Sequence, residues 1–213
     1  MNISILVTSK EHPVNRYIAR WAERNNNHKI NIIHSKKEIT FGEILFLISC
    51  SEIITKLERN KFKKTLLIHA SDLPYGRGWS PHIWEIINGA TNIILSLLEA
   101  EDKVDTGNIW KKISVKIPKT ATFDEINELI FDSELRLMDF AIENYNTVKP
   151  EKQSNIGSSS YWPKRSSKDS EIDINKNISK QFDLIRVCDP DRFPAFFFKD
   201  GEKFNITIKK SNE

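Results

Sequence analysis

The chain has 213 residues, of which 39% are hydrophobic and 10% aromatic, and this content supports a folded core and excludes a wholly disordered protein. Its 32 basic and 29 acidic residues give a formal net charge of +3. This near-balance excludes a protein that binds nucleic acid through bulk charge alone. The length predicts one principal domain with room for a small appendage.

The cysteines and the N-terminus indicate the cellular environment. Cys50 and Cys188 lack CxxC or zinc-ligand spacing and lie in apolar runs, so we expect two buried thiols in a reducing compartment and no metal site. Residues 1–9 lack the charged start and the long apolar core of a signal peptide. No apolar run approaches the roughly 20 residues of a membrane span. We therefore expect a cytoplasmic protein without a membrane partner.

Strand and helix patterns alternate through residue 145. In chain order they are strand Ile3–Thr8, helix His12–Asn26, strand Lys29–His34, strand Ile44–Cys50, helix Ser51–Glu58, strand Thr65–Ala70, helix His82–Asn88, strand Asn92–Leu98, strand Ile109–Ile117 and helix Thr122–Tyr145. Thr122 and Glu125 form a capping-box pattern at the start of the longest helix. This alternation predicts an α/β, Rossmann-like fold with a mostly parallel sheet flanked by helices.

The composition changes after residue 148. Residues 149–160 are rich in Ser, Asn, Lys and Pro, and we interpret residues 149–174 as a linker or loop. A helix is expected over Asn175–Val187, and two strands joined at Asp200-Gly201 predict a hairpin. The expected organisation is a core domain of residues 1–148, the linker, and a small C-terminal helix-and-hairpin subdomain of residues 175–213.

Two residues that could do acid–base chemistry stand near predicted strand ends. His69 lies at the end of the strand Thr65–Ala70, and Asp105 follows the next strand in the stretch Val104-Asp105-Thr106-Gly107. We expect neighbouring strand ends to bring the two side chains together. A carboxylate on one ring nitrogen fixes the tautomer of a histidine and leaves the other nitrogen as a base.

The motifs around these residues resemble those of the folate-dependent formyltransferase family. The family carries Asn-x-His, Pro-Ser-Leu-Leu-Pro-x-x-x-Gly and Leu-Asp-Thr-Gly, and here the stretches are Leu67-Ile68-His69, Ala70 to Gly78 and Val104 to Gly107. The resemblance spans roughly residues 40–145. It implies an enzyme that transfers a formyl group from N10-formyltetrahydrofolate to a primary amine. In that reaction His69 accepts the amine proton and Asp105 orients it.

The resemblance also implies how the folate is held. Backbone groups near two loops would bind the pterin ring, at Ile48, Ser49, Cys50, Ser51, Glu101, Asp102 and Val104. The family asparagine that stabilises the oxyanion falls at Leu67, which cannot donate a hydrogen bond. Losing one such donor costs about 100- to 1000-fold in rate. We expect a substitute, from His69, Ser71, a backbone N–H or a water, and the alternative is an inactive protein.

The C-terminal part bears on the acceptor. The stretches Tyr161 to Arg165, Leu184 to Arg186 and Arg192 to Phe198 resemble those of nucleotide-sugar N-formyltransferases, and the loop after His69 is most similar to enzymes of pseudaminic acid pathways. This implies a UDP-linked 4-amino-4,6-dideoxy-N-acetyl hexosamine as the acceptor. The candidate substrate-binding residues are Ser71, Arg77, Gly78, Trp79, Arg165 and Arg186.

Other readings stay open. A glycinamide-ribonucleotide acceptor suits a compact enzyme of similar length, although the tail differs from that group. The departure at Leu67 leaves open a non-catalytic relative that binds folate or a nucleotide sugar. A methionyl-tRNA acceptor would need a second domain of about a hundred residues and a basic face. Since the chain shows neither, we expect no nucleic-acid partner. The resemblance also implies a homodimer, and it leaves UDP versus dTDP and the sugar stereochemistry undecided.

Overall fold

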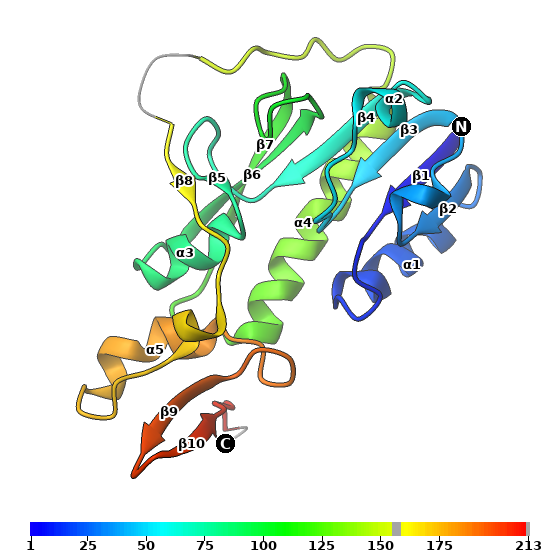
Figure 1. Cartoon of the computed structure of the whole chain (residues 1–213). Coiled ribbons are helices and arrows are strands. Elements are labelled where there is room, and N and C mark those ends of the chain that lie inside the picture. The colour runs from blue at the N-terminus through cyan, green and yellow to red at the C-terminus, as the bar shows by residue number, and fades with distance from the viewer. Residues whose placement is uncertain (155–158, 212–213) are drawn as a thin grey trace.

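A single six-stranded sheet forms the centre of the molecule (Figure 1). The structure is a computed structural model that describes residues 1–154 and 159–211; residues 155–158 of the expected linker and residues 212–213 of the expected C-terminal subdomain lie outside the described residues. The strand order is β2-β1-β3-β4-β6-β7. The strands are β1 (Asn2–Leu6), β2 (Lys29–Ile33), β3 (Gly42–Leu47), β4 (Phe62–His69), β6 (Asn92–Glu99) and β7 (Ile109–Lys116).

The directions of these strands explain where the chain can place side chains. Strand β1 pairs in parallel with β2 and β3, and β3 pairs in parallel with β4. Strand β6 runs antiparallel to β4, with His69 opposite Ser96 and Leu66 opposite Glu99, and β7 is antiparallel to β6. The prediction of an α/β fold with a mostly parallel sheet is therefore confirmed, with one strand, β6, that runs opposite to the other five.

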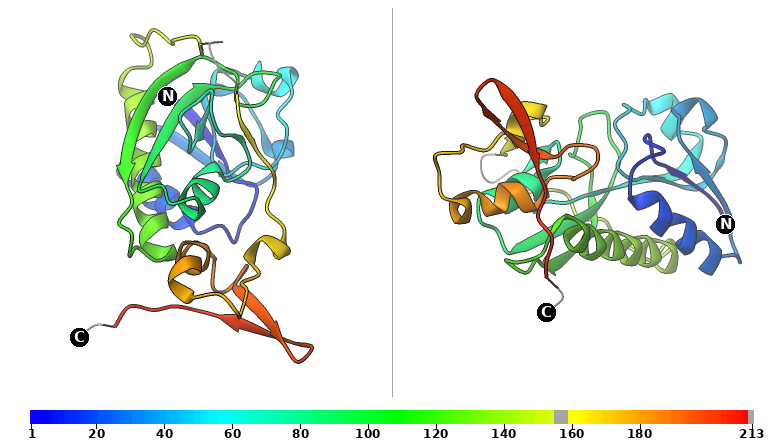
Figure 2. Two further views of the ribbon diagram at one scale, coloured as in Figure 1. Left: turned by 90° about the vertical axis from the view of Figure 1, so that its left-hand side faces the viewer. Right: turned by 90° about the horizontal axis from the view of Figure 1, so that it is seen from below.

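Two helices cover one face of the sheet. Helix α1 (Val14–Arg24) and helix α4 (Phe123–Glu143) pack against each other on the same side (Figure 2), and α3 (Pro81–Ile87) adds Ile86 to this apolar core. The indole N–H of Trp21 donates to Asp139 at 2.6 Å. The opposite face carries a second apolar cluster, to which Ile39 and Ile54 contribute from the segments beside the short helices η1 (Lys36–Glu38) and α2 (Lys56–Arg59). No helix of the described part of the chain is long and apolar enough to cross a membrane.

Some element boundaries differ from the sequence predictions. The helix expected over Ser51–Glu58 is a single turn that begins at Lys56, because Thr55 and Glu58 form a capping box there. Strand β4 begins at Phe62 rather than Thr65, since Phe62 already pairs with Gly42 of β3. The capping box of Thr122 and Glu125 is present and starts α4 as predicted.

The C-terminal part lies against the core at two places. The two-residue strand β8 (Tyr161–Trp162) pairs in parallel with β5 (Arg77–Gly78), which belongs to the loop after His69. After η2 (Ser167–Ser170), helix α5 (Ile178–Arg186) contacts α3. The predicted hairpin is formed by β9 (Ala195–Lys199) and β10 (Glu202–Ile206), beside α5 at one end of the molecule (Figures 1 and 2).

Candidate active site

His69 and Asp105 meet at the end of β4. The Nδ1 atom of His69 lies 3.6 Å from Oδ1 of Asp105, and the two residues are only 7% and 6% exposed. The other ring nitrogen, Nε2, lies 2.8 Å from the carbonyl oxygen of Gly76. An oxygen acceptor therefore faces each ring nitrogen and fixes the ring orientation. The expected proximity of the two side chains is present, and their roles in catalysis remain proposals.

The chain reaches Asp105 by a different route from the one expected. Because β6 is antiparallel to β4, its last residue, Glu99, lies beside Leu66 and not beside His69. The loop of residues 100–108 turns back across the sheet edge to bring Asp105 to His69. Asp105 has a φ of 56°, in the left-handed region, and its Oδ2 accepts a hydrogen bond from the Gly78 N–H at 3.0 Å. At Gly107, a Cβ would lie 1.8 Å from the Glu99 carbonyl oxygen, so the turn requires glycine.

Gln153 joins this loop to the loop after His69. Its Nε2 donates to the carbonyl oxygens of Asp105, at 2.8 Å, and Gly107, at 3.0 Å. Its Oε1 accepts from Nη2 of Arg77 at 2.8 Å. Sequence reasoning missed this residue, because a single glutamine in a polar stretch carries no periodicity and no motif spacing.

The loop of residues 70–80 is held from within and by β8. The buried Ser71 hydroxyl donates to the Tyr75 carbonyl at 2.9 Å, and the Gly76 N–H donates to the Ser160 hydroxyl at 2.8 Å. The Trp79 N–H donates to the Trp162 carbonyl at 3.0 Å. The Nε of Arg77 is buried and has no hydrogen-bond partner within the described part of the chain.

Of the six predicted substrate-binding residues, four lie on one loop, and the other two, Arg165 and Arg186, lie in the C-terminal part of the chain. Ser71, Arg77, Gly78 and Trp79 all lie on the loop next to His69. The Lys164 ammonium lies 4.8 Å from the centre of the Trp79 ring. Arg165 donates to the Asp169 carbonyl and the Ser170 hydroxyl.

The structure does not bring Arg186 to this loop. It is 1% exposed, in α5, and its guanidinium group donates to the carbonyl oxygens of Pro118 and Ala121 and to the Asp183 carboxylate. These contacts tie the end of α5 to the turn that precedes α4.

The two loops predicted to hold a pterin lie on the face of the sheet that carries His69. Cys50, Leu67 and Ala100 pack against one apolar cluster there, beside Leu47. Cys50 is half-buried rather than buried as expected, and burial raises the pKa of its thiol to about 11. The Asp102 carboxylate accepts a hydrogen bond from the buried Arg59, which anchors the second loop.

The chemistry of these loops fits a pterin. The aromatic ring of a pterin needs apolar walls, and its polar edge needs backbone donors and acceptors. Leu67, Cys50 and Ala100 supply apolar contacts. Across residues 1–154 and 159–211, the backbone N–H groups of Glu101, Asp102, Lys103 and Val104 have no acceptor within the protein. The first loop contains Ser49, whose φ of 46° turns the chain sharply after β3, and Ser51, whose N–H donates to the Thr8 hydroxyl.

Burial shifts the pKa of two titratable groups beside the loop toward the uncharged form. Burial, with a smaller effect of Asp72, raises the pKa of Glu85 to about 7. Its carboxylate lies close to Gly76. Burial also lowers the pKa of His82 to about 4, helped by the nearby His69. The His82 side chain is half-buried overall, but its Nδ1 is fully enclosed and lacks a partner among the described residues.

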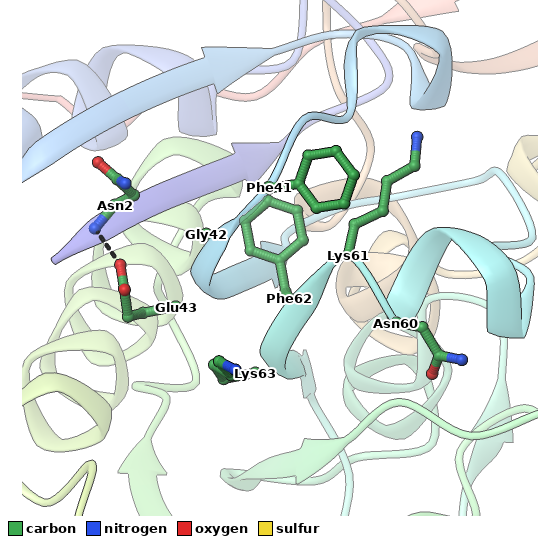
Figure 3. A pocket seen from close by; sticks show the side chains of 8 residues that line it. All are labelled: Asn2, Phe41, Gly42, Glu43, Asn60, Lys61, Phe62 and Lys63. Carbon is green, nitrogen blue, oxygen red and sulfur yellow. Dashed lines mark hydrogen bonds between the residues drawn. The ribbon is translucent and has the colours of Figure 1, made fainter.

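Two open hollows of the molecule lie away from this site. One of about 340 Å³ opens at the opposite end of the sheet, between the starts of β1, β3 and β4, and is walled by Phe41 and Phe62 (Figure 3). Another of about 520 Å³ lies beside η2 and Phe198. Neither is lined by a histidine or by the pterin loops, so the chemistry places the candidate active site at His69 and Asp105 instead. No cluster of three His, Cys, Asp or Glu residues suited to a metal occurs in the described ranges.

Comparison with known proteins gives consistent matches. A family model described as formyl transferase matches residues 2–142. A curated methionyl-tRNA formyltransferase from Clostridium acetobutylicum is 28% identical over 165 residues, which cover 76% of this chain and 52% of that protein. The chain thus spans about half the length of the curated relatives it matches.

Solved structures with different names share the fold. A methionyl-tRNA formyltransferase from Clostridium thermocellum superposes with a TM-score of 0.84 at 24% identity, covering 100% of this chain and 94% of that one. A 4-N formyltransferase from Francisella tularensis gives 0.72 at 17% identity, covering 100% and 98%. HypX from Aquifex aeolicus in complex with tetrahydrofolic acid gives 0.77 at 18% identity, covering 98% and 37%.

Proposed function

The chain belongs to the formyl transferase family, whose formyl donor is N10-formyltetrahydrofolate, and we propose that its acceptor is the amine of a UDP-linked 4-amino-4,6-dideoxy-N-acetyl hexosamine. The observation that carries a catalytic role is the contact of His69 with Asp105 beside a glycine-rich loop. A buried imidazole oriented by a carboxylate is suited to take a proton from an attacking amine.

The geometry assigns each ring nitrogen a task in this proposal. Nδ1 of His69 faces Asp105, so Nε2 is the atom that accepts the amine proton. The Gly76 carbonyl can only accept, so Nε2 carries a proton in its contact with that oxygen. When the acceptor binds, the loop must release this contact and the ring must carry its proton on Nδ1, toward Asp105, so that Nε2 is free to act as the base. The folate donor supplies the formyl carbon. The new C–N bond forms at that carbon, the bond to N10 breaks, and N10 keeps the electron pair and takes up the proton that the amine gave to His69.

Leu67 narrows the candidates for the oxyanion donor. Its side chain packs against the apolar cluster beside the pterin loops and offers no donor. The Ser71 hydroxyl already donates to the Tyr75 carbonyl within the buried loop, so it is not free for this task. We therefore favour protonated His69 or a backbone N–H as the substitute.

The surroundings of the loop support a nucleotide-sugar acceptor. The unpartnered Nε of Arg77 costs about 1–3 kcal/mol while no acceptor reaches it, and a phosphate oxygen would supply one. Tyr161 exposes 62% of its surface next to Arg77 and offers a ring on which a uracil can stack. Lys164, held over Trp79, and Arg165 add positive charge nearby. In this proposal the buried Arg186 supports α5 and does not contact the diphosphate.

A second acceptor has specific support. The curated relatives at 28% identity and the solved structure with a TM-score of 0.84 are named methionyl-tRNA formyltransferases. Since the chain matches only about half of those relatives, their acceptor is a competing proposal for this chain. Within either proposal, residues 1–148 carry the His69–Asp105 pair, and residues 149–174 contribute contacts to its loops. Helix α5 of the proposed C-terminal subdomain, residues 175–213, packs on α3. A homodimer is also part of this proposal, on the basis of the resemblance.

The test is a comparison of acceptors with N10-formyltetrahydrofolate as the donor. UDP- and dTDP-linked 4-amino sugars, glycinamide ribonucleotide and methionyl-tRNA are each incubated with the protein, and products are followed by mass. Formylation of a sugar amine supports the proposed acceptor. Formylation of methionyl-tRNA alone would contradict it and support the second acceptor. Binding of folate and sugar without product identifies a non-catalytic relative.

Two variants test the proposed roles of the pair. His69→Asn abolishes turnover and leaves the folded state intact, which circular dichroism checks. Asp105→Ala lowers the rate by orders of magnitude with little effect on donor affinity. Wild-type turnover in His69→Asn would remove the imidazole from the mechanism.

A further inference from the structure

Gln153 uses its whole side-chain amide to connect two loops. Both N–H bonds of its Nε2 go to main-chain carbonyls of one loop, at Asp105 and Gly107, and its Oε1 accepts from Arg77 of the other. The glutamine lies 48 residues after Asp105 and 76 residues after Arg77 in the chain. A side chain that satisfies all these partners has one orientation, so the two loops are held in a fixed relation.

The contacts to Asp105 and Gly107 bear on the direction of the Asp105 carboxylate. Asp105 adopts a left-handed φ of 56°, which a residue with a Cβ rarely keeps without external support. Fixing the carbonyls at Asp105 and Gly107 fixes the peptide planes on both sides of the turn. The carboxylate then points to Nδ1 of His69 and to the N–H of Gly78.

The contact to Arg77 extends this support toward the acceptor. Nη2 of Arg77 is held by Gln153, while its Nε is buried without a partner among the described residues. A guanidinium held at one end and unsatisfied at the other is prepared to bind an anionic oxygen. The Gln153 amide therefore connects Arg77 by hydrogen bonds to the main chain of Asp105, and an anionic oxygen that binds Arg77 contacts one end of this connection.

We propose that Gln153 is a positioning residue that couples Arg77 to the His69–Asp105 pair. This inference rests on the proposed function, since it names the residue that holds the catalytic pair in register with the acceptor site. Gln153 touches neither donor nor acceptor; it acts through Asp105 on one side and Arg77 on the other.

The chain offers a matched control in Gln181 of α5. Its Nε2 donates to the carbonyls of Asp173 and Lys176, and its Oε1 accepts from the Asp173 N–H. Gln181→Ala thus removes the same number of hydrogen bonds from an equally half-buried site on a different element. Gln153→Ala should lower kcat by about 10- to 100-fold, because small misplacements of a catalytic group have costs of this size. Gln181→Ala should leave kcat unchanged.

Gln153→Glu separates the two halves of the coupling. A carboxylate still accepts from Arg77 but cannot donate to the carbonyls of Asp105 and Gly107. We expect kcat to fall as in Gln153→Ala, while the KM for the acceptor stays near the wild-type value. In Gln153→Ala, which loses the Arg77 contact as well, the KM for the acceptor should rise.

A second readout does not depend on turnover. The ¹⁵N shifts of the His69 ring, assigned by their absence in His69→Asn, report the hydrogen bonds of both ring nitrogens. They should move in Gln153→Ala and stay in place in Gln181→Ala. Unmoved ring shifts, or wild-type kcat in Gln153→Ala, would overturn the coupling. If no acceptor is formylated by the wild-type protein, the proposed function fails, and the ring shifts alone then decide for or against the coupling.

Discussion

A buried carboxylic acid in the core provides the sharpest prediction about stability. Glu134 lies on α4, is 8% exposed, and has an Oε2 without a hydrogen-bond partner in the described part of the chain. Burial raises its pKa from 4.5 to about 8. The folded protein therefore keeps this proton in a pH range in which the unfolded chain releases it. Since the folded state binds more protons, its free energy of unfolding falls as the pH rises from about 5 to about 8.

The magnitude follows from the shift. Each pKa unit corresponds to about 1.4 kcal/mol, so the shift from 4.5 to about 8 is worth about 5 kcal/mol well above the folded-state pKa, of which roughly 3 kcal/mol is already present at pH 7. Glutamine has nearly the same shape and does not ionise. The free energy of unfolding of Glu134→Gln, minus that of the wild type, should therefore grow by about 3 kcal/mol between about pH 5 and about pH 8.

Urea unfolding across this pH range measures the difference, provided that the transition is two-state. The matched control is Glu128→Gln, the same substitution at an exposed position of the same helix, for which the difference should not depend on pH. The effects of other titrating groups, such as the half-buried His12 and His82, cancel because they are common to all three proteins. A pH-independent difference for Glu134→Gln would refute the argument.

Three further outcomes test the site and its supports. Leu67→Asn should raise turnover if no full substitute for the oxyanion donor exists, by up to about 100-fold in a steady-state assay; an unchanged rate would show that another group fills this role. Gly107→Ala places a methyl group against the Glu99 carbonyl and should lower stability by about 3 kcal/mol in thermal unfolding and reduce kcat as Asp105 shifts. Arg186→Ala should lower the free energy of unfolding by about 2 kcal/mol or more without changing the KM for the acceptor. A higher KM with unchanged stability would instead indicate that Arg186 binds the substrate.

The regular elements were largely predictable, because apolar periodicity reports burial directly. The strands of the sheet and the long helix α4 were each found from their spacing, and the capping box at Thr122 marked the start of α4. The direction of β6 was not predictable. A helix, α3, lies between β4 and β6, and a strand–helix–strand sequence usually gives a parallel pair. Here the pair is antiparallel, and no local pattern in residues 70–91 records that choice.

The site was predictable only where its residues carry a motif. His69 and Asp105 stand in stretches with distinctive neighbours, and the structure brings them together. Strands β5 and β8 have two residues each, which is too short for any alternation to appear. Gln153 and Ser160 act through contacts that span more than 45 and 80 residues, respectively. Such pairings depend on the path of the whole chain, so a stretch that looks like a linker supplies much of the support of the site.

The contact of His69 with Gly76 bears on how the proposed base becomes available. The Gly76 carbonyl satisfies Nε2 of His69, so no buried polar atom of the ring is left without a partner. In the proposed mechanism an amine N–H replaces this carbonyl and donates to Nε2, so the ring must first carry its proton on Nδ1, toward Asp105. Gly76 has a φ of 69°, a conformation open to glycine, which lets the loop rotate its carbonyl without a side-chain clash. In this proposal the loop covers the imidazole before the acceptor arrives and releases it by rotating the Gly76 carbonyl.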